Sequence, residues 1–477
     1  MDIIPVTAEF EEYLRDESRS IGSAEQILFA KTEDDIFRVL QAGRQITIQG
    51  ARTGITAGAV PNGGLILNLS RMDRIGDIQN NRITVQPGAL LSNVRKKVEA
   101  AGLFFPPDPT ETSASLGGMI SCNASGALSY HYGPTRDWIH ALRIVLANGD
   151  LLRIERGQKA DGKSFALTTE SGHRISGTLP ELKLPAVKSA AGYYIKPDMD
   201  LIDLFIGMEG TLGVITEAEL NLIPAPETRQ ALCAFFPTEE SALQFVHFLR
   251  EKIKPVAIEF FGHNALGLLR RSTLDLPVLP ESFHTAVYFE FHHTAEEEID
   301  AAAEKMMELG VGENDCWLAD TPSEIKIHKS FRHATPEAVN QVIGQRKKDC
   351  PGLTKLGTDM SVPDEYLEEI MQIYRCELAD NGLEYVIFGH IGDNHLHVNI
   401  LPRNMDELDQ GKALYLKWAD QIVATGGSVS AEHGIGKLKV PMLEKMFGVD
   451  GIAAMREIKK LFDPDGILSP GNLFETS

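Results

Sequence analysis

The sequence predicts an α+β protein with two domains and a helical C-terminal segment, and three observations lead to this fold class. The chain has 477 residues, which is more than one hydrophobic core usually serves. In the first half, short apolar stretches alternate with glycine-rich turns. Beyond about residue 227, longer segments with apolar residues at helical spacing alternate with strand-like segments.

Short strands and turns organise the first domain, which we expect at residues 1–226. The β-branched residues of "QITIQ" (45–49) predict a strand that leads into a glycine-rich turn. In "RITVQPGALLSNVRKKVEAAG" (82–102), strand-like alternation ends at a Pro-Gly turn and helical spacing follows, so we expect strand, turn and helix. The pattern continues to "LFIGMEGTLGVITEAELNLIP" (204–224), a turn followed by a strand.

Longer elements characterise the second domain, which we expect at residues 227–425. "QALCAFFPTEESALQFVHFLREK" (230–252) predicts a strand and then an amphipathic helix. "AIEFFG" (257–262) and "TAVYFEFHH" (285–293) predict strands, and "TAEEEIDAAAEKMMELG" (294–310) predicts a helix. We expect the last segment, 426–477, to be helical with a glycine- and proline-rich end.

Composition excludes several classes of function. The net charge of -21 argues against a nucleic-acid or anionic-membrane surface. No stretch approaches the ~20 apolar residues of a membrane span, and the acidic N-terminus predicts no signal peptide. The five cysteines are scattered without a CxxC pair, which favours a reducing compartment and excludes a self-contained iron–sulfur or zinc-ribbon site. We therefore expect a cytoplasmic protein, with peripheral membrane association through a partner left open.

Three glycine-rich segments carry the first chemical signal. In "GARTGITAG" (50–58), permissive backbones let successive N–H groups converge on an anion, and two threonine hydroxyls add donors. An ordinary glycine-rich turn is the alternative, but the spacing fits neither a Rossmann fingerprint nor a Walker A loop. Small residues in series in "PPDPTETSASLGGMISCNASGALSYHYGPTRDWI" (106–139), and again in "GMEGTLGVIT" (207–216), are typical of backbone wrapped closely round a large flat ligand.

Together these segments resemble the flavoprotein superfamily of vanillyl-alcohol oxidase and p-cresol methylhydroxylase. The resemblance implies a two-part FAD-binding domain of the vanillyl-alcohol oxidase type with an α+β cap domain that holds the substrate. The first loop lacks the His or Cys that attaches FAD covalently in many relatives, so we expect non-covalent FAD. The residues that the resemblance places at FAD are Arg52, Thr53, Gly54, Ile55, Thr56, Ala57, Gly58, Asp108, Gly117, Gly118, Cys122, Gly126, Glu209, Gly210, Gly213 and Ile215.

A histidine-rich stretch, "VIFGHIGDNHLHVNILP" (386–402), carries the second signal. Strand alternation places His395, His397 and Asn399 on one face, with His390 in the preceding turn. Glu432 follows in "SAEHGIGK". Imidazoles and a carboxylate suit zinc, manganese or iron, and fewer than four protein ligands would leave positions for substrate. The alternative is a set of structural histidines.

These motifs resemble the FAD-linked D-2-hydroxyacid dehydrogenase branch, which includes D-lactate and D-2-hydroxyglutarate dehydrogenases and the flavin subunit of glycolate oxidase. The resemblance places the metal ligands at His390, His397 and Glu432, the catalytic base at His433, and substrate contacts at Arg332, Lys355 and Asn399. Relatives often have Asn where this chain has His395, so a swapped or extra ligand stays open. Met208 and "SPGN" (469–472) also depart from the family pattern.

The resemblance implies FAD- and metal-dependent oxidation of a D-2-hydroxyacid to the 2-oxoacid. A hydroxyacid can chelate one metal, which lowers the hydroxyl pKa, and the C2 hydride then passes to flavin N5. We expect zinc, with manganese or iron as alternatives. Electrons then leave to an external acceptor: electron-transfer flavoprotein, an iron–sulfur subunit, quinone or cytochrome. A homodimer is left open. The rival hypotheses are a metal-free FAD-dependent oxidase or transferase acting on another alcohol-type substrate, and a non-enzymatic FAD-bearing scaffold.

Overall fold

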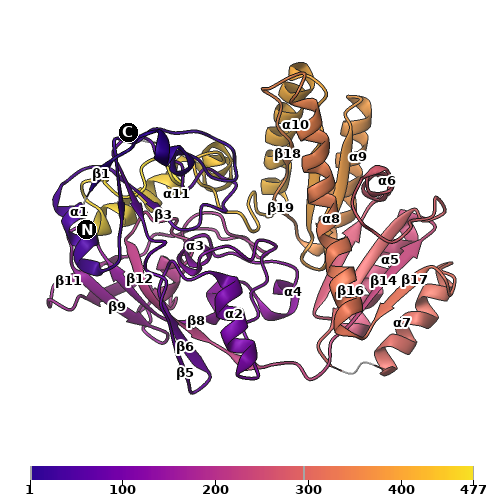
Figure 1. The fold of residues 1–477 in the computed structure, drawn as a ribbon, viewed down its shortest axis with the longest axis horizontal. Coiled ribbons are helices and arrows are strands. Elements are labelled where there is room, and N and C mark those ends of the chain that lie inside the picture. Colours follow the sequence, from indigo (N-terminus) through magenta and orange to yellow (C-terminus); the bar gives the residue numbers. More distant parts are fainter. Residues whose placement is uncertain (1–2, 294–295, 476–477) are drawn as a thin grey trace.

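Two lobes divide the described chain, which comprises residues 3–293 and 296–475 of the computed structural model (Figure 1). The elements of the first lobe are β1 (Ile4–Pro5), β2 (Gln26–Phe29), α1 (Glu33–Gln41), β3 (Ile46–Gln49), β4 (Leu65–Asn68), β5 (Ile75–Gln79), β6 (Arg82–Val85), α2 (Leu91–Ala100), β7 (Leu103–Phe104), α3 (Leu116–Cys122), α4 (Ser129–Tyr132), β8 (Ile139–Val145), β9 (Leu151–Glu155), β10 (Ser164–Thr168), β11 (Arg174–Thr178), β12 (Val214–Asn221) and β13 (Ile223–Pro224).

Two larger sheets, with the two-stranded sheets β10-β11 and β13-β7, build this first lobe. One has the order β1-β2-β4-β3, in which β4 lies parallel to both β2 and β3. The other is antiparallel, in the order β5-β6-β12-β8-β9. The strand at 45–49 and the strand–turn–helix at 82–102 are confirmed as β3, β6 and α2. The first glycine-rich loop connects β3 to β4 within one sheet, the second lies between β7 and β8, and the third leads into β12.

The second lobe is one large sheet with helices on it. Its elements are β14 (Gln230–Phe236), α5 (Glu239–Phe248), β15 (Ala257–Phe261), α6 (His263–Arg271), β16 (Thr285–Phe291), α7 (Glu296–Glu308), β17 (Cys316–Ala319), α8 (Pro322–Arg346), β18 (Leu356–Gly357), β19 (Met360–Ser361), α9 (Leu367–Asp380), β20 (Tyr385–His390), β21 (His395–Ile400) and α10 (Met405–Ala424). The strand order is β17-β14-β16-β15-β20-β21-β18, and β19 also pairs with β21. The strands expected at 257–262 and 285–293 are confirmed, as is the helix at 294–310 within its described residues.

The two faces of this sheet have different neighbours. Leu396, Val398 and Ile400 of β21 belong to the largest core cluster, whereas Val386 and Phe388 of β20 pack with side chains of α6 and α8. A threonine capping box and a proline in the first turn start α8. The face under α8 is the one that carries the polar side chains described below.

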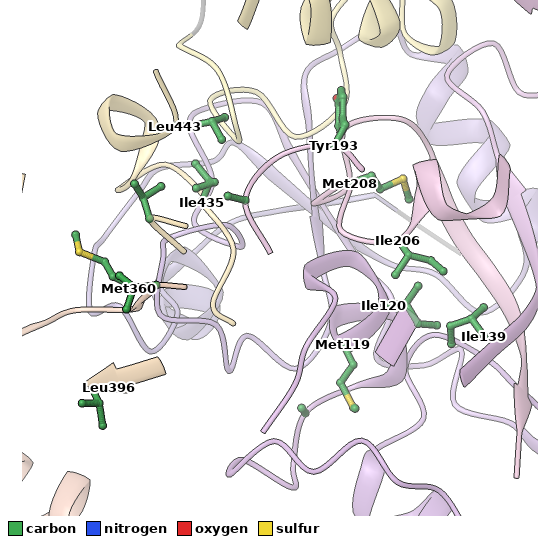
Figure 2. Close-up of a cluster of buried hydrophobic side chains, with 14 of the residues drawn as sticks. Met119, Ile120, Ile139, Tyr193, Ile206, Met208, Met360, Leu396, Ile435 and Leu443 are labelled. Atoms are coloured by element: carbon green, nitrogen blue, oxygen red, sulfur yellow. The ribbon is translucent and has the colours of Figure 1, made fainter. Parts of the chain in front are cut away.

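The chain then returns to the first lobe. Helix α11 (Val440–Phe462), drawn in yellow, belongs to the first lobe in Figure 1, and its residues Met455 and Ile458 join the core cluster that contains Met119 of α3. One core cluster runs through both lobes and this crossing segment, from Met119 of α3 through Met208 and Ile435 to Leu396 of β21 (Figure 2). Burial of a continuous apolar core is the main force that holds the lobes together. Among the described helices, none has both the length and the apolarity needed to cross a lipid bilayer.

Candidate active site

Three histidines lie on one face of the β20–β21 hairpin. His390 pairs across the strands with His395, and Phe388 pairs with His397. Since cross-strand partners point to the same side of a sheet, the three imidazoles share one face. Their ring centroids lie 4.5 to 5.5 Å apart. The alternation predicted from the sequence is confirmed, with one correction: His390 ends strand β20 and does not lie in the turn.

In two of these rings, the nitrogen that faces away from the other histidines, Nδ1, is held by a protein oxygen. His390 Nδ1 lies 2.7 Å from Glu259 Oε1, and His397 Nδ1 lies 3.1 Å from the carbonyl oxygen of Thr358. Such contacts fix the tautomer and turn the other nitrogen, Nε2, toward the shared space. A carbonyl or carboxylate behind an imidazole is the usual support of a metal-ligating histidine.

Glu432 brings a carboxylate to the same space from the loop between α10 and α11. Its Oε2 lies 3.3 Å from His390 Nε2, while its Oε1 accepts hydrogen bonds from Lys188 Nζ at 2.5 Å and Ser125 Oγ at 3.1 Å. Four residues each offer one ligand atom, and these atoms lie within 4.8 Å of one another: Glu432, His390, His395 and His397. Nitrogen and oxygen donors at this spacing fit zinc, manganese or iron.

The electrostatics of this four-residue cluster favour a cation. Burial alone would raise the pKa of Glu432, but His390 and Lys188 outweigh it and hold that pKa well below its usual range. Burial, reinforced by His395 and His390, holds the pKa of His397 well below the usual histidine value. Burial would lower the pKa of His390, but Glu259 and Glu432 outweigh it and raise that pKa to about 10. Since an ionised carboxylate and neutral imidazoles are the forms that bind a metal, His390 would release a proton when a metal binds.

Asp359 fixes the loop that carries Glu432. Its buried carboxylate accepts backbone hydrogen bonds from Glu432 at 3.1 Å and His433 at 3.0 Å, and a side-chain hydrogen bond from Lys439 at 2.6 Å. Burial would raise its pKa, but His433 and Lys439 overcome this and hold the pKa well below its usual range. The loop conformation therefore depends on a residue between β18 and β19, 74 positions away from His433.

His433 lies beside the cluster with one nitrogen turned away from it. Its Nδ1 lies 3.3 Å from Asp359 Oδ2, and its ring stacks on His397 with centroids 5.6 Å apart. Its side chain is 30% exposed, whereas the Glu432 side chain is 8% exposed. With Nδ1 held by the carboxylate, Nε2 is the nitrogen available to a proton on substrate.

Arg332, on α8, approaches the same face and joins the two lobes. Its Nη2 donates to Asp108 Oδ2 at 3.2 Å, and Arg95 Nη2 donates to the other oxygen at 2.9 Å. The Nη1 of Arg332 is buried and has no hydrogen-bond partner among the described residues. A guanidinium with one nitrogen anchored and another free is suited to receive a carboxylate.

The other two predicted substrate contacts have different surroundings. Asn399 is buried on β21, two residues beyond His397 on the same face, opposite Gly357. Lys355 lies just before β18, where burial and Arg19 lower its pKa. Within the described parts of the chain, no contact joins Lys355 to the histidines or to Arg332.

The first glycine-rich loop has the backbone of an anion site. Arg52 and Ala57 have positive φ values of 62° and 61°, which turn neighbouring amides toward a common centre. Within the described chain, none of the backbone N–H groups of residues 53–59 donates a hydrogen bond to protein. Amides that are free of protein partners can bind an anion, so the loop fits the pyrophosphate of FAD.

A buried polar network ties this loop to the other predicted flavin segments. Asn472 Nδ2 donates to the carbonyl oxygens of Gly58 and Glu209, both at 3.0 Å, and Lys437 Nζ donates to Asn472 Oδ1 at 2.6 Å. The Glu209 carboxylate accepts from the backbone of Ile435 and Gly436 at 2.7 and 2.6 Å. Burial raises the pKa of Glu209 to about 7. Asn472, the last residue of "SPGN", therefore links the first glycine-rich loop to the segment that carries Glu209 and to Lys437.

Several predicted cofactor residues also have packing roles. A Cβ on Gly126 would lie 1.8 Å from the carbonyl oxygen of Asp108, and one on Gly117 would lie 2.5 Å from Pro87. These glycines allow the loops to approach one another. Cys122 ends α3, and burial, reinforced by Glu209 and Asp16, raises the pKa of its thiol to about 12.

The sequence did not indicate Glu259, Asp359 or Lys188 as site residues. Each contacts a member of the cluster across 36 or more positions of sequence, and none belongs to a glycine-rich or histidine-rich motif. A charged residue within an otherwise apolar strand, such as Glu259 in "AIEFF", is the only signal that the sequence offers.

Comparison with known proteins identifies the family of this chain. Residues 24–155 match the family described as FAD binding domain, and residues 225–473 match the family described as FAD linked oxidases, C-terminal domain. Over 463 residues the chain is 30% identical to glycolate oxidase subunit GlcD of Bacillus subtilis, covering 94% of this chain and 88% of that protein. It is 29% identical to a D-lactate dehydrogenase of Anaerostipes hadrus, covering 97% and 92% of the two chains.

Another relative and a solved structure extend the comparison. A D-2-hydroxyglutarate dehydrogenase of Stutzerimonas stutzeri is 31% identical, with 89% of this chain and 84% of that protein covered. A structure of alkyldihydroxyacetonephosphate synthase superposes with a TM-score of 0.63 at 14% identity over 94% of this chain and 77% of the other, which shows the shared fold. The chain is therefore an FAD-dependent oxidoreductase that belongs to the FAD-linked oxidases of the vanillyl-alcohol oxidase/p-cresol methylhydroxylase superfamily.

Proposed function

We propose that this chain oxidises a D-2-hydroxyacid, of the D-lactate, glycolate or D-2-hydroxyglutarate type, to the 2-oxoacid with FAD and a divalent metal. The observation that carries the proposal is the His/Glu cluster, in which Nδ1 of His390 and of His397 is held by a protein oxygen, next to the independently held His433. Relatives named for glycolate, D-lactate and D-2-hydroxyglutarate support the substrate class, because all three are 2-hydroxyacids.

The cofactors supply the chemistry that amino acids lack. FAD, held by residues 52–58 with the segments around Asp108, Gly118 and Glu209, supplies the acceptor for the C2 hydride at N5. The metal, held by His390, His397 and Glu432, supplies a Lewis acid that acidifies an alcohol. The residues fit both groups, because the loop offers unpaired backbone donors and the cluster offers convergent donor atoms.

The chain's own residues then orient the substrate and move one proton. Arg332, anchored by Asp108, directs its free Nη1 at the substrate carboxylate. Asn399 offers an amide on the same face, and Lys355 remains a weaker candidate for substrate contact. His433 Nε2 accepts the hydroxyl proton, and Asp359 stabilises the imidazolium that forms.

The remaining features of the proposal concern electrons and location. We propose an external electron acceptor and a cytoplasmic location, supported by cysteines that are all free in the structure. We also propose that residues 227–425 form the substrate domain against a flavin domain built from 1–226 and 426–477.

The test of function is anaerobic mixing of the yellow protein with a panel of D- and L-2-hydroxyacids. Bleaching by a D-acid is expected, and an unchanged flavin with every acid would reject the proposal.

Non-covalent FAD is the first testable consequence. The loop "GARTGITAG" contains neither His nor Cys, so no side chain there can form the bond. Acid precipitation is therefore expected to leave the yellow colour in the supernatant. Colour that stays with the pellet would show a covalent flavin.

A further inference from the structure

His395 is the member of the cluster that the predicted ligand set leaves unassigned. It is fully buried, and its ring lies 5.4 Å from that of His390 and 4.5 Å from that of His397, between centroids. It stands directly opposite His390 in the hairpin register. Its position is therefore as central to the shared space as that of either predicted histidine ligand.

The two nitrogens of His395 have different surroundings. Nε2 lies 3.0 Å from Asp359 Oδ1, whereas Nδ1 lies 3.9 Å from Glu432 Oε1. Neither nitrogen makes a hydrogen bond of good geometry within the described residues. A buried nitrogen without a partner is unfavourable and calls for a reason. This Nδ1 points into the space that the other donor atoms share, so a bound cation would give it a partner.

The support behind His395 matches the support behind an assigned ligand. Asp359 stands behind Nε2 of His395 as Glu259 stands behind Nδ1 of His390. A histidine with only a structural role could contact Asp359 through one nitrogen. Its other nitrogen, which is also buried, would then need a hydrogen-bond partner of its own. Here that nitrogen faces the Glu432 carboxylate instead.

We propose that His395 is a fourth protein ligand, donated through Nδ1, so that three histidines and Glu432 hold the metal. This inference rests on the metal site of the proposed function. Four protein ligands fill a tetrahedral site and leave no position for substrate. The resident ion must therefore accept five or six ligands. With six, two positions remain, which match the carboxylate and hydroxyl oxygens of a 2-hydroxyacid and favour manganese or iron over tetrahedral zinc.

The test is titration of metal-depleted, FAD-loaded protein with Mn²⁺, in competition with a chelating indicator. His395→Ala is expected to weaken Mn²⁺ binding by more than about 100-fold, as His390→Ala should, and Asp359→Asn by about 10- to 100-fold. His292→Ala is the matched control: it removes another histidine of the second lobe, which contacts Glu290 there and Tyr132 of the first lobe, and should bind Mn²⁺ like the wild type. An affinity of His395→Ala equal to that of His292→Ala would overturn the proposal.

If His395→Ala does not fold, a second variant and a second metal probe still test the proposal. His395→Asn keeps a polar side chain beside Asp359 but no imidazole, and the flavin spectrum reports its folding. It should also lose Mn²⁺ affinity, and wild-type affinity would overturn the proposal. Co²⁺ in the wild type is expected to show the weak absorption bands of a six-coordinate ion. The intense bands of a tetrahedral ion would contradict the proposed coordination.

Failure of this inference can be told apart from failure of the proposed function, because the titration needs no substrate. Loss of Mn²⁺ affinity in His395→Ala supports the fourth ligand even if no hydroxyacid reduces the wild-type flavin. Full affinity in His395→Ala overturns it even if a D-2-hydroxyacid does reduce that flavin.

Discussion

Glu432→Gln is expected to lose the bound metal and nearly all flavin reduction by substrate, while it keeps FAD. The amide has the size of the carboxylate but no charge, so the cluster would lose its one anionic donor. Lys188, 2.5 Å from Glu432, would also lose its buried counter-charge. His390→Ala and His397→Ala should give the same result, because each removes a donor atom. The flavin loops lie elsewhere, so the yellow colour should remain.

Metal analysis and anaerobic reduction kinetics of each variant check this expectation. Asp463→Asn is a matched control, since it neutralises another buried carboxylate that accepts from a lysine, Lys459, and from backbone amides, but in the first lobe. That control should keep its metal. Glu432→Gln protein with a full complement of metal would show that this carboxylate is not a ligand.

His433→Ala should separate proton transfer from metal binding. A positioned general base contributes about 10²–10⁴-fold in rate, and we expect flavin reduction to fall by that factor. The variant should retain metal and FAD, because Asp359 still holds the backbone of the loop through the N–H groups of residues 432 and 433. Substrate binding should also persist through Arg332 and Asn399.

Stopped-flow reduction together with metal analysis tests this second prediction. His284→Ala is a suitable control: it removes a partly buried histidine that hydrogen-bonds to Thr285, at the end of β16, and should reduce at the wild-type rate. Metal-free His433→Ala protein would make His433 a ligand. An unchanged reduction rate would remove it from the mechanism.

Local patterns were sufficient to predict the hairpin face. The period of two along β21 places His395, His397 and Asn399 together, and the structure confirms it because Leu396, Val398 and Ile400 fill the opposite core. The same reasoning misplaced His390, since Gly389 and Gly392 suggested an earlier turn. Strand β20 in fact continues through Gly389, which pairs with Leu396.

Contacts between distant strands could not be predicted in this way. Glu259 meets His390 across 131 positions and Lys188 meets Glu432 across 244, because the sheet order and the lobe packing bring them together. No local periodicity encodes which strand lies beside β20. The residues that support the cluster are therefore brought there by the tertiary fold, whereas the candidate ligands are visible as motifs in the sequence.

In the loops of the first lobe, too, the local backbone was predictable from the sequence, whereas the contacts between distant residues were not. Their glycines indicated a close backbone approach, and the positive φ values of Arg52 and Ala57 agree with it. The link from Asn472 to Glu209 and Lys437 was not predicted, because "SPGN" departs from the family pattern at the position that makes the contact.

Metal-dependent reduction of the flavin tests the central claim most directly. The wild-type protein is mixed anaerobically with the D-2-hydroxyacid that bleaches it fastest, first as purified, then after chelation, and then after return of Mn²⁺ or Zn²⁺. The account predicts rapid bleaching, its loss on chelation with FAD still bound, and its recovery with metal. Equal bleaching in the chelated protein would contradict the account, and would favour a metal-free flavin enzyme instead.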